Sequence, residues 1–409
     1  MKILMVAPHH ASMHRGGAEV ASSRLAEALR LRGNDVWELA AASEGMDLPS
    51  TISALSDHKY LLSEGYSDGL RFTSARSAWA NRELIEWMIR FNPDVIHFHH
   101  FVGVGSDLIF LARHAMPGVR IVFTAHEMLA MCARDGKMVR RDGSLCHRPS
   151  NVECTACVDE APVSLFLRDE YMGRVLRQAD VVTAPSVFLS TRLAEWMGTA
   201  VAWIPNCPPN AELQDPRPLA EGEGRSVFGF FGQIIPSKGL HLLLAAMIDA
   251  KRDASIPITL LVFGTRPDAA YWEQVVEPSM AKLAKGVVRV VDGGAYIPED
   301  AVKLMGLVDW VCVPSLWWEN APTVVLEAVS AGRPVLANDL GGMAEALAVT
   351  SGGKTVANAN AIYWSRQLQE AADPERTSAW DAIRSRMRLP WTAESIADQY
   401  LDQYSSRDE

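Results

Sequence analysis

The sequence lacks the features of a membrane-spanning or nucleic-acid-binding protein. No stretch approaches the roughly 18 to 20 uninterrupted apolar residues that cross a bilayer, and the first residues, MKILMVAPHH, lack the layout of a secretory signal. Lysine and arginine form no long run, and the formal net charge is −10, whereas a protein that follows a phosphate backbone needs a basic stripe. We therefore expect a cytoplasmic protein without a nucleic-acid partner.

Two familiar nucleotide-binding patterns are also missing. The segment SGGKT (351–355) has Ala348 where the first glycine of a P-loop would stand. Gly103 and Gly105 form a G-x-G without the third glycine of a dinucleotide fingerprint. The sequence therefore predicts neither of these two sites.

Cysteine is scarce, yet four of the six cysteines fall between positions 132 and 157. Four thiolates that include one C-x-x-C pair are typical of a tetrahedral structural zinc site. The irregular spacing of the other two leaves reduced, unliganded thiols as an alternative, and a cytoplasmic setting argues against a disulfide. The candidate zinc ligands are Cys132, Cys146, Cys154 and Cys157, in an Arg-rich insertion at about 128–160.

A unit of short apolar run, turn and amphipathic helix repeats along the chain and predicts an α/β fold. Two series of these units, separated by a polar, Pro-rich stretch, imply two doubly wound parallel-sheet domains, each similar to a Rossmann fold. The expected strands lie at 2–8, 35–40, 94–100, 119–126, 180–186 and 201–206, and then at 226–233, 258–265, 287–294, 309–315 and 334–340. The predicted organisation is a first domain at 1–205, a linker or hinge at 206–225, a second domain at 226–389, and a C-terminal helix within 390–409 that packs back on the first domain.

The stretch ENAPTVVLE (319–327) places two glutamates around a predicted helix start at Pro322. Free amides near the start of such a helix, at Ala321, Thr323 and Val324, favour an anionic group such as a diphosphate. A carboxylate deeper in the helix, at Glu327, can accept both hydroxyls of a ribose. The alternative is that Glu319 caps the helix by its charge and that Glu327 lies on a solvated face.

The longer segment PSLWWENAPTVVLEAVSAGRPVLANDLGGMAE (314–345) resembles the E-x7-E region of retaining glycosyltransferases of the GT-B fold, often labelled family 4. The resemblance implies two Rossmann-like domains that face a central cleft, with the donor in the second domain and the acceptor in the first. It also implies that Glu327 binds the nucleotide ribose and that Glu319 contacts the transferred sugar. Asn320, Ala321 and Thr323 would lie at the diphosphate.

Three further segments are similar to motifs of the same family. Gly16 and Gly17 resemble a G-G-x-E loop in which an amide approaches the donor phosphate, although a G-G pair alone is more often a tight turn. FGQIIPSKG (231–239) resembles a phosphate-binding segment in which Lys238 matches the lysine, while Gln233 stands where the family has arginine. TAHE (124–127) resembles a motif that places His126 beside the donor sugar.

Other basic and histidine residues have two alternative interpretations. Arg266 follows the strand at 258–265 and is a candidate for the missing positive charge, or else faces solvent. His99 and His100 are candidate walls of the acceptor site, or hydrogen-bonded residues of a strand end. The segment 70–93 mixes arginine with tryptophan, which suits contact with an anionic membrane, or else packs its aromatic face on the first sheet.

The resemblance implies a retaining glycosyltransferase that moves a sugar from a nucleotide-diphosphate sugar to an acceptor hydroxyl. Since the sequence has no D-x-D triplet, we expect no catalytic metal or other catalytic cofactor, and zinc only as a structural ion. The expected acceptor is a glycan or a lipid-linked molecule of bacterial surface polysaccharide assembly, with peripheral membrane contact. The alternatives are a soluble transferase of a small metabolite and a catalytically silent GT-B scaffold. The expected catalytic residues are His126, Glu319 and Lys238, and the expected donor-binding residues are Gly16, Gly17, Gln233, Lys238, Arg266, Asn320, Ala321, Thr323 and Glu327.

Overall fold

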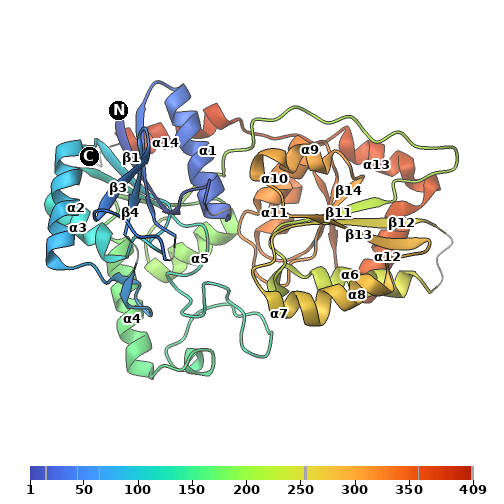
Figure 1. The fold of residues 1–409 in the computed structure, drawn as a ribbon, viewed down its shortest axis with the longest axis horizontal. Coiled ribbons are helices and arrows are strands. Elements are labelled where there is room, and N and C mark those ends of the chain that lie inside the picture. The colour runs from blue at the N-terminus through green and yellow to red at the C-terminus, as the bar shows by residue number, and fades with distance from the viewer. Residues whose placement is uncertain (14–15, 44, 64, 253–255, 358, 407–409) are drawn as a thin grey trace. The chain divides into compact units, whose positions relative to one another are not determined.

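The computed structural model describes residues 1–13, 16–43, 45–63, 65–252, 256–357 and 359–406. The chain divides into two compact units. The first unit comprises Met1–Cys207 and Trp391–Glu409, and the second comprises Pro208–Pro390. Figure 1 shows the fold and labels many of the elements of both units.

The first unit is built on a sheet with the strand order β10-β9-β8-β7-β1-β2-β4-β3. Every neighbouring pair is parallel except β3 with β4, so most strands are joined by helical crossovers. A separate small antiparallel pair joins β5 and β6. The strands are β1 (Lys2–His9), β2 (Asp35–Ala41), β3 (Ile52–Ser56), β4 (Lys59–Leu62), β5 (Tyr66–Asp68), β6 (Thr73–Ser74), β7 (Val95–Phe98), β8 (Arg120–Thr124), β9 (Val181–Ala184) and β10 (Ala202–Trp203).

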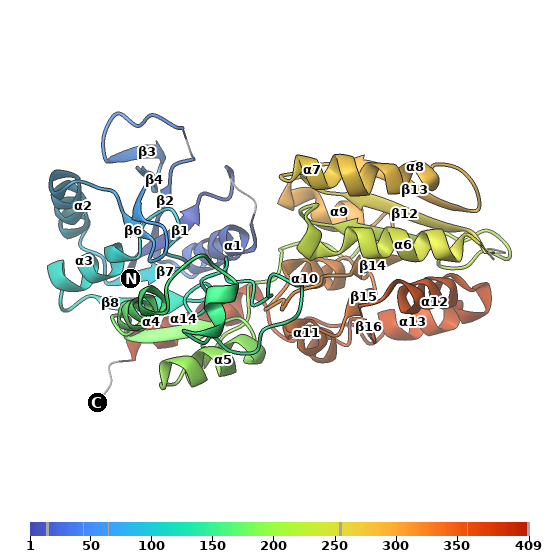
Figure 2. The ribbon, with the colours of Figure 1, turned by 90° about the horizontal axis from the view of Figure 1, so that it is seen from below.

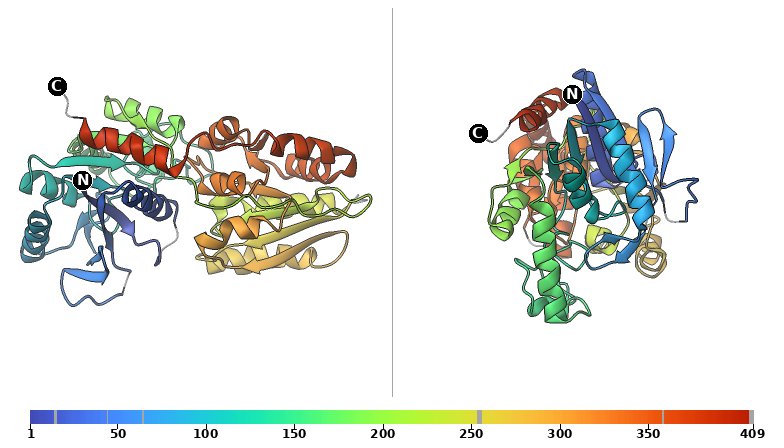
Figure 3. Two further views of the ribbon diagram at one scale, coloured as in Figure 1. Left: turned by 90° about the horizontal axis from the view of Figure 1, so that it is seen from above. Right: turned by 90° about the vertical axis from the view of Figure 1, so that its left-hand side faces the viewer.

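The helices of the first unit include one from the end of the chain. Helix α14 begins after a capping box at Thr392 and Ser395, and it buries Tyr400 and Tyr404 in the core of the first unit. It packs on α1, where Leu25 belongs to the same core (Figure 3). The helices are α1 (Gly17–Leu31), α2 (Ala78–Phe91), α3 (Asp107–Ala115), α4 (Pro162–Leu176), α5 (Val187–Met197) and α14 (Ala393–Ser405).

The Cys-bearing insertion connects β8 to α4 and lies beside the start of α4 (Figure 2). It has little regular structure: a single antiparallel bridge joins Val139 to Leu145, and a 3₁₀ turn follows at Glu153–Ala156. Arg168 of α4 is buried and donates hydrogen bonds to the carbonyls of Leu129 and Ala130, which fixes the first part of the insertion to the helix.

The second unit has a fully parallel sheet with the order β13-β12-β11-β14-β15-β16. One apolar cluster includes residues of α6 and α12, and another includes residues of α9, α10 and α11, so helices cover both faces. The strands are β11 (Val227–Phe231), β12 (Ile258–Phe263), β13 (Val288–Gly294), β14 (Trp310–Val313), β15 (Val335–Asn338) and β16 (Gly353–Val356). The helices are α6 (Leu240–Ala250), α7 (Ala269–Tyr271), α8 (Glu277–Lys282), α9 (Ala301–Met305), α10 (Thr323–Ser330), α11 (Gly342–Thr350), α12 (Ala361–Ala372) and α13 (Thr377–Arg384).

The strand order reverses direction between β11 and β14, which are hydrogen-bonded neighbours although they are far apart in sequence. In an open parallel sheet, loops at the carboxyl ends of two such strands diverge and leave a place for a ligand. The loop after β11 carries Lys238, and the loop after β14 carries Glu319. The topology of the second unit therefore brings these two predicted site residues to one edge of one sheet.

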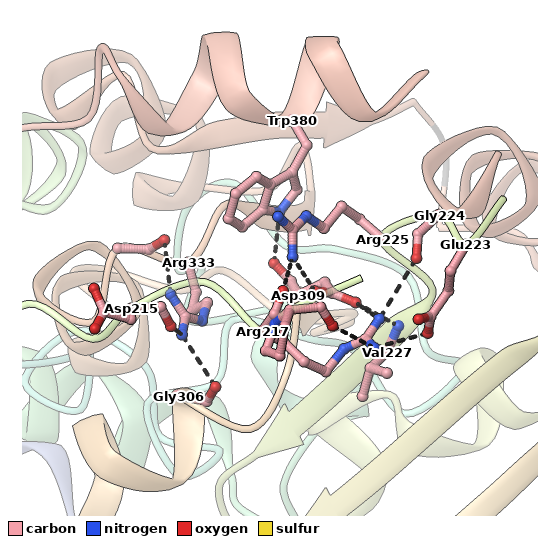
Figure 4. Close-up of polar contacts among 12 residues, drawn as sticks. Asp215, Arg217, Glu223, Gly224, Arg225, Val227, Gly306, Asp309, Arg333 and Trp380 are labelled. Carbon is pink, nitrogen blue, oxygen red and sulfur yellow. Dashed lines mark hydrogen bonds and ion pairs between the residues drawn. The ribbon is translucent and has the colours of Figure 1, made fainter. Parts of the chain in front are cut away.

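The segment 206–225, which the sequence predicts to be a linker or hinge, is packed rather than free. Asn206 and Cys207 belong to the first unit, where Cys207 is buried in the core, and residues 208–225 belong to the second unit. Arg217 donates to the carboxylate of Asp309, and Arg333 donates to the backbone carbonyls of Gln214 and Asp215 (Figure 4). A low content of regular structure was therefore no sign of a lack of tertiary contacts.

In the part of the chain that the structure describes, no helix is both long and apolar enough to cross a membrane. Helix α2, the expected aromatic segment, buries Leu84, Met88 and Phe91, and Trp87 packs against Tyr60 with the ring centroids 5.2 Å apart. Most of its apolar face thus packs on the first unit.

Candidate donor site and histidine cluster

Lys238 and Glu319 form an ion pair at the switch point of the second sheet. The ammonium Nζ of Lys238 lies 2.5 Å from Oε1 of Glu319, and the carboxylate is buried, with 6% of the residue exposed. The indole N–H of Trp317 and the hydroxyl of Ser315 donate to the same oxygen, at 2.7 and 2.8 Å. Three donors on one buried oxygen hold Glu319 in a single orientation.

These contacts determine the charge of Glu319. Burial alone would raise the pKa of its carboxyl group, but the ion pair with Lys238 and the hydrogen bonds from Trp317 and Ser315 hold the pKa below its ordinary value. The carboxylate is therefore ionised at neutral pH. The sequence predicted Lys238 and Glu319 as site residues, but it gave no sign of Trp317 and Ser315, whose roles depend on how the loop after β14 folds.

Two glycines allow the loops of this site to approach each other. Gly239 has φ +72°, and a Cβ at this position would lie 2.0 Å from the carbonyl oxygen of Pro314. A Cβ on Gly342 would lie 1.6 Å from the carbonyl oxygen of Asn320. Because neither position has room for a side chain, Gly239 lets the Lys238 turn approach Pro314 after β14, and Gly342 lets the start of α11 approach Asn320.

Helix α10 begins at Thr323, so Pro322 is its N-cap residue rather than its first helical residue. The first amides of any helix have no acceptor within the helix, and together with the helix dipole they favour an anion. Asn320 and Glu327 are buried, with 7% and 5% of each residue exposed. The burial of Glu327 and the interior position of Glu319 contradict the alternative in which one faces solvent and the other only caps the helix.

The other expected donor residues of the second unit lie on neighbouring loops. Gln233 is exposed in the loop after β11. Arg266, in the loop after β12, pairs with Asp292 and stacks on Trp272, with its guanidinium 3.4 Å from the ring centroid. Arg266 thus has a carboxylate partner while 35% of its side chain stays exposed, and its expected contact with the donor phosphate stays a prediction.

In the first unit, the strand ends β7 and β8 bring four histidines together. Nδ1 of His99 lies 2.9 Å from Nε2 of His126, and Nε2 of His100 lies 3.1 Å from a carboxylate oxygen of Glu127. His97 lies 2.7 Å from both the hydroxyl of Tyr404 and Oγ1 of Thr124. Tyr404 is on α14, so the last helix contributes to the same buried polar network.

Burial keeps three of these imidazoles neutral, those of His97, His99 and His126. Burial, with a smaller contribution from His100, lowers the pKa of His126 to about 3, and burial lowers that of His99 well below its ordinary value. Neutral His126 can donate or accept a hydrogen bond but does not act as an acid near pH 7. His99, expected only as a possible wall residue, contacts His126 directly, and its Nε2 has no hydrogen-bond partner among the residues that the structure describes.

The glycine pair at the start of α1 has a local structural reason. A Cβ on Gly16 would lie 2.4 Å from a carboxylate oxygen of Glu19, whereas a Cβ on Gly17 would meet no atom within 4 Å. Gly16 therefore leaves room for the buried carboxylate of Glu19, and Gly17 leaves the backbone at the helix start open.

Two family models match most of the chain. The model described as Glycosyltransferase Family 4 matches residues 15–207, and the model described as Glycosyl transferases group 1 matches residues 225–372. A phosphatidyl-myo-inositol mannosyltransferase of Mycolicibacterium smegmatis is 27% identical over 363 residues, which cover 87% of this chain and 81% of that protein. A D-inositol 3-phosphate glycosyltransferase of Nocardia farcinica is 25% identical over 329 residues, which cover 75% of this chain and 66% of that protein.

Solved structures are also similar to this chain over nearly its whole length. A sucrose-phosphate synthase from Thermosynechococcus elongatus has a TM-score of 0.68 at 20% identity and covers 98% of each chain. The Anabaena protein HepE, solved in complex with UDP and glucose, has a TM-score of 0.64 at 17% identity and covers each chain fully. At these identities the likeness is one of fold.

Proposed function

This chain belongs to glycosyltransferase family 4, and we propose that it is a retaining enzyme that needs no metal for transfer. It has the GT-B fold, and it transfers a sugar from a nucleotide sugar. The observation that carries it is the buried contact of Lys238 with Glu319 beside the start of α10.

The donor diphosphate is proposed to bind at Lys238 and the first amides of α10. An ammonium has three N–H donors, so Lys238 can keep its bond to Glu319 and still donate to a phosphate oxygen. The charge that develops on the leaving diphosphate is then met by groups already in place, and such preorganised donors commonly contribute several kcal/mol to catalysis. Glu327 is proposed to accept the ribose hydroxyls, and Glu319 to contact the transferred sugar.

The proposed transfer proceeds on one face of the sugar. The bond between the anomeric carbon and the diphosphate oxygen breaks, and a bond from the acceptor oxygen forms on the same face, which retains the configuration. The acceptor proton passes to the leaving diphosphate, so no separate base is needed. His126, neutral in the first unit, is proposed to hydrogen-bond a sugar hydroxyl rather than to transfer a proton.

The acceptor is proposed to be a glycan or a lipid-linked molecule, with peripheral contact of the enzyme with a membrane. Trp79 and Ile89 of α2 are 69% and 49% exposed and lie on one helix face with the exposed Arg82. A small phosphorylated polyol is the second candidate acceptor, because several relatives are named D-inositol 3-phosphate glycosyltransferases.

The test is a thermal-shift screen of UDP, GDP, ADP and dTDP and their common sugars. A ligand that binds only the folded protein at 100 times its Kd stabilises it by about 2.7 kcal/mol. We expect a shift with one nucleotide, its loss in Lys238→Ala and Glu327→Ala, and its retention in Lys303→Ala, a change at an exposed lysine of α9.

The transfer itself is tested on an acceptor found by incubating the matching donor with polyol, glycan and lipid-linked candidates. Proton NMR of the product gives its anomeric configuration, which we expect to match that of the donor. Inversion, or loss of transfer after a chelator and its recovery with Mg²⁺, contradicts the proposed mechanism. Wild-type protein that binds no nucleotide contradicts the donor site.

A further inference from the structure

The four clustered cysteines line one small cavity in the insertion of the first unit. The cavity has a volume of about 20 Å³, which is room for one water molecule or one ion. None of the four cysteines is in a disulfide. The rest of the lining is mostly apolar, and it includes Met138, Val139 and Pro149. The insertion has too little regular structure to form a core of its own. Its separate turns instead meet at the cavity that the four cysteines line.

The cysteines reach the cavity from separate turns. Cys132 comes from the loop after β8, and Cys146 follows the bridge of Val139 with Leu145. Cys154 lies within a 3₁₀ turn, and Cys157 directly follows that turn. The amide of Ser150 donates to the sulfur of Cys154 at 3.3 Å. This hydrogen bond fixes the position of the Cys154 sulfur at the cavity, while burial, the larger effect on this thiol, raises its pKa.

Arginines surround the cluster and hold its backbone. Arg141 donates to the carbonyl of Cys157 at 2.9 Å, and Arg192 donates to the carbonyl of His147, next to Cys146, at 2.7 Å. Arg168 is buried close enough to Cys132 and Cys154 for their charges to interact with its own. Four thiolates with one Zn²⁺ carry a net charge of −2, and these guanidinium groups have the sign and the position to balance it.

We propose that Cys132, Cys146, Cys154 and Cys157 bind one structural Zn²⁺ as a tetrahedral thiolate site. In the part of the chain that the structure describes, no three cysteine, histidine or carboxylate side chains already stand at coordination distance, so binding requires the thiols to turn toward the centre of the cavity. The four thiols lose their protons to solvent as the four Zn–S bonds form. A disulfide and free thiols are the competing states.

The zinc ion would also restrain residues that precede the cysteine cluster, at Glu127 and His126. A Cβ on Gly136, four residues beyond Cys132, would lie 1.8 Å from the carboxylate of Glu127, so the insertion packs directly on this residue. Glu127 pairs with His100 and follows His126 in the chain. Zinc would thereby hold the backbone that carries His126 in place. This last step rests on the proposed function, whereas the metal site does not.

The first experiment is elemental analysis of wild-type protein purified without chelators. We expect about one zinc per chain, loss of most of it in Cys146→Ser and in Cys157→Ser, and full retention in Cys312→Ala. Cys312 is a matched control because it is a buried cysteine of β14, outside the cavity. Folded wild-type protein that contains no zinc, takes up none when zinc is added, and has all four thiols open to a thiol reagent overturns the proposal.

A second measurement covers the case in which the variants do not fold. X-ray absorption at the zinc edge of the wild-type protein should show four sulfur neighbours at about 2.3 Å. A nitrogen or oxygen shell overturns the assignment of ligands. Donor binding separates this result from the proposed function, because the nucleotide thermal shift depends on Lys238 and Glu327 of the second unit and should survive removal of zinc.

Discussion

Replacing Asp309 with alanine should destabilise the second unit more than any exposed charge change. The side chain of Asp309 is fully buried, and its carboxylate accepts hydrogen bonds from Arg217 at 3.0 Å, Arg225 at 3.3 Å and the amide of Val227 at 3.0 Å (Figure 4). Arg225 also stacks on Trp380, 4.3 Å from the ring centroid. Without the carboxylate, Arg217 and Arg225 each lose one of their acceptors, and the amide of Val227 loses the carboxylate oxygen, at a position that is fully buried.

The expected loss of unfolding free energy follows from the burial of the ion pairs that Asp309 forms with Arg217 and Arg225. Removing one partner of a buried ion pair costs about 3 to 5 kcal/mol, because the remaining charge stays desolvated. For a unit of this size, each kcal/mol lowers the melting temperature by about 2 to 4 °C. The transition of the second unit should therefore fall by about 6 to 20 °C. Asp249→Ala is the control, because Asp249 pairs with Arg252 at 3.6 Å on the surface of α6 and such pairs are worth about 0 to 1 kcal/mol.

The assay is thermal and urea unfolding of the full chain, followed by tryptophan fluorescence and by calorimetry, which can separate the transitions of two units. Trp380 reports directly on the site, since its indole N–H donates to the backbone carbonyl of Asp309. If Asp309→Ala and Asp249→Ala shift the melting temperature equally, then the arginine cluster contributes no more than surface charge, and the reasoning is refuted.

Three other changes have definite expected outcomes. Gly239→Ala should abolish the nucleotide thermal shift, because the new Cβ would meet the carbonyl of Pro314. The control is Gly294→Ala, also at positive φ but in open space, which should lower the unfolding free energy by about 1 to 2 kcal/mol and keep the nucleotide shift. Equal nucleotide binding by both variants would contradict the close approach of Gly239 to Pro314. Burial, with a smaller contribution from His126, lowers the pKa of His97 to about 3, so below about pH 6.5 the unfolded state binds a proton that the folded state does not bind. Urea unfolding should therefore show the unfolding free energy falling by about 1.4 kcal/mol per pH unit toward pH 3 for this residue. His97→Gln should make this dependence on pH less steep. Tyr404→Phe removes the hydroxyl next to Nδ1 of His97 and should lower the unfolding free energy by about 1 to 3 kcal/mol in denaturant titration, whereas Tyr363→Phe, at an exposed residue, should change it little.

The expected strands recur in the structure because buried parallel strands are nearly continuous apolar runs, which are visible in one sequence. The segments that escaped prediction lack this property. Strand β3 is largely exposed and pairs antiparallel at the edge of the sheet. Strand β16 begins within SGGKT, a segment for which only a nucleotide-binding pattern had been considered. Short edge strands have too few buried residues to show a period.

The candidate site could be predicted as far as its motifs extend. Glu319, Glu327 and Lys238 could be named because ENAPTVVLE and FGQIIPSKG resemble motifs of the glycosyltransferase family. The partners of these residues could not be predicted, since the sequence does not say which side chains of other loops fold against them. Trp317 and Ser315 on Glu319, and His99 on His126, are contacts of tertiary structure alone.

The position of α14 in the first unit has a consequence during synthesis of the chain. The core that contains Leu25 and Met5 is completed by Tyr400 and Tyr404, which leave the ribosome only after all of Pro208–Pro390 has been made. At about 5 to 20 residues per second, this takes about 10 to 40 s. For that time the nascent first unit displays an uncovered apolar face, a natural binding site for a chaperone, and a ribosome stalled within the second unit leaves that face exposed.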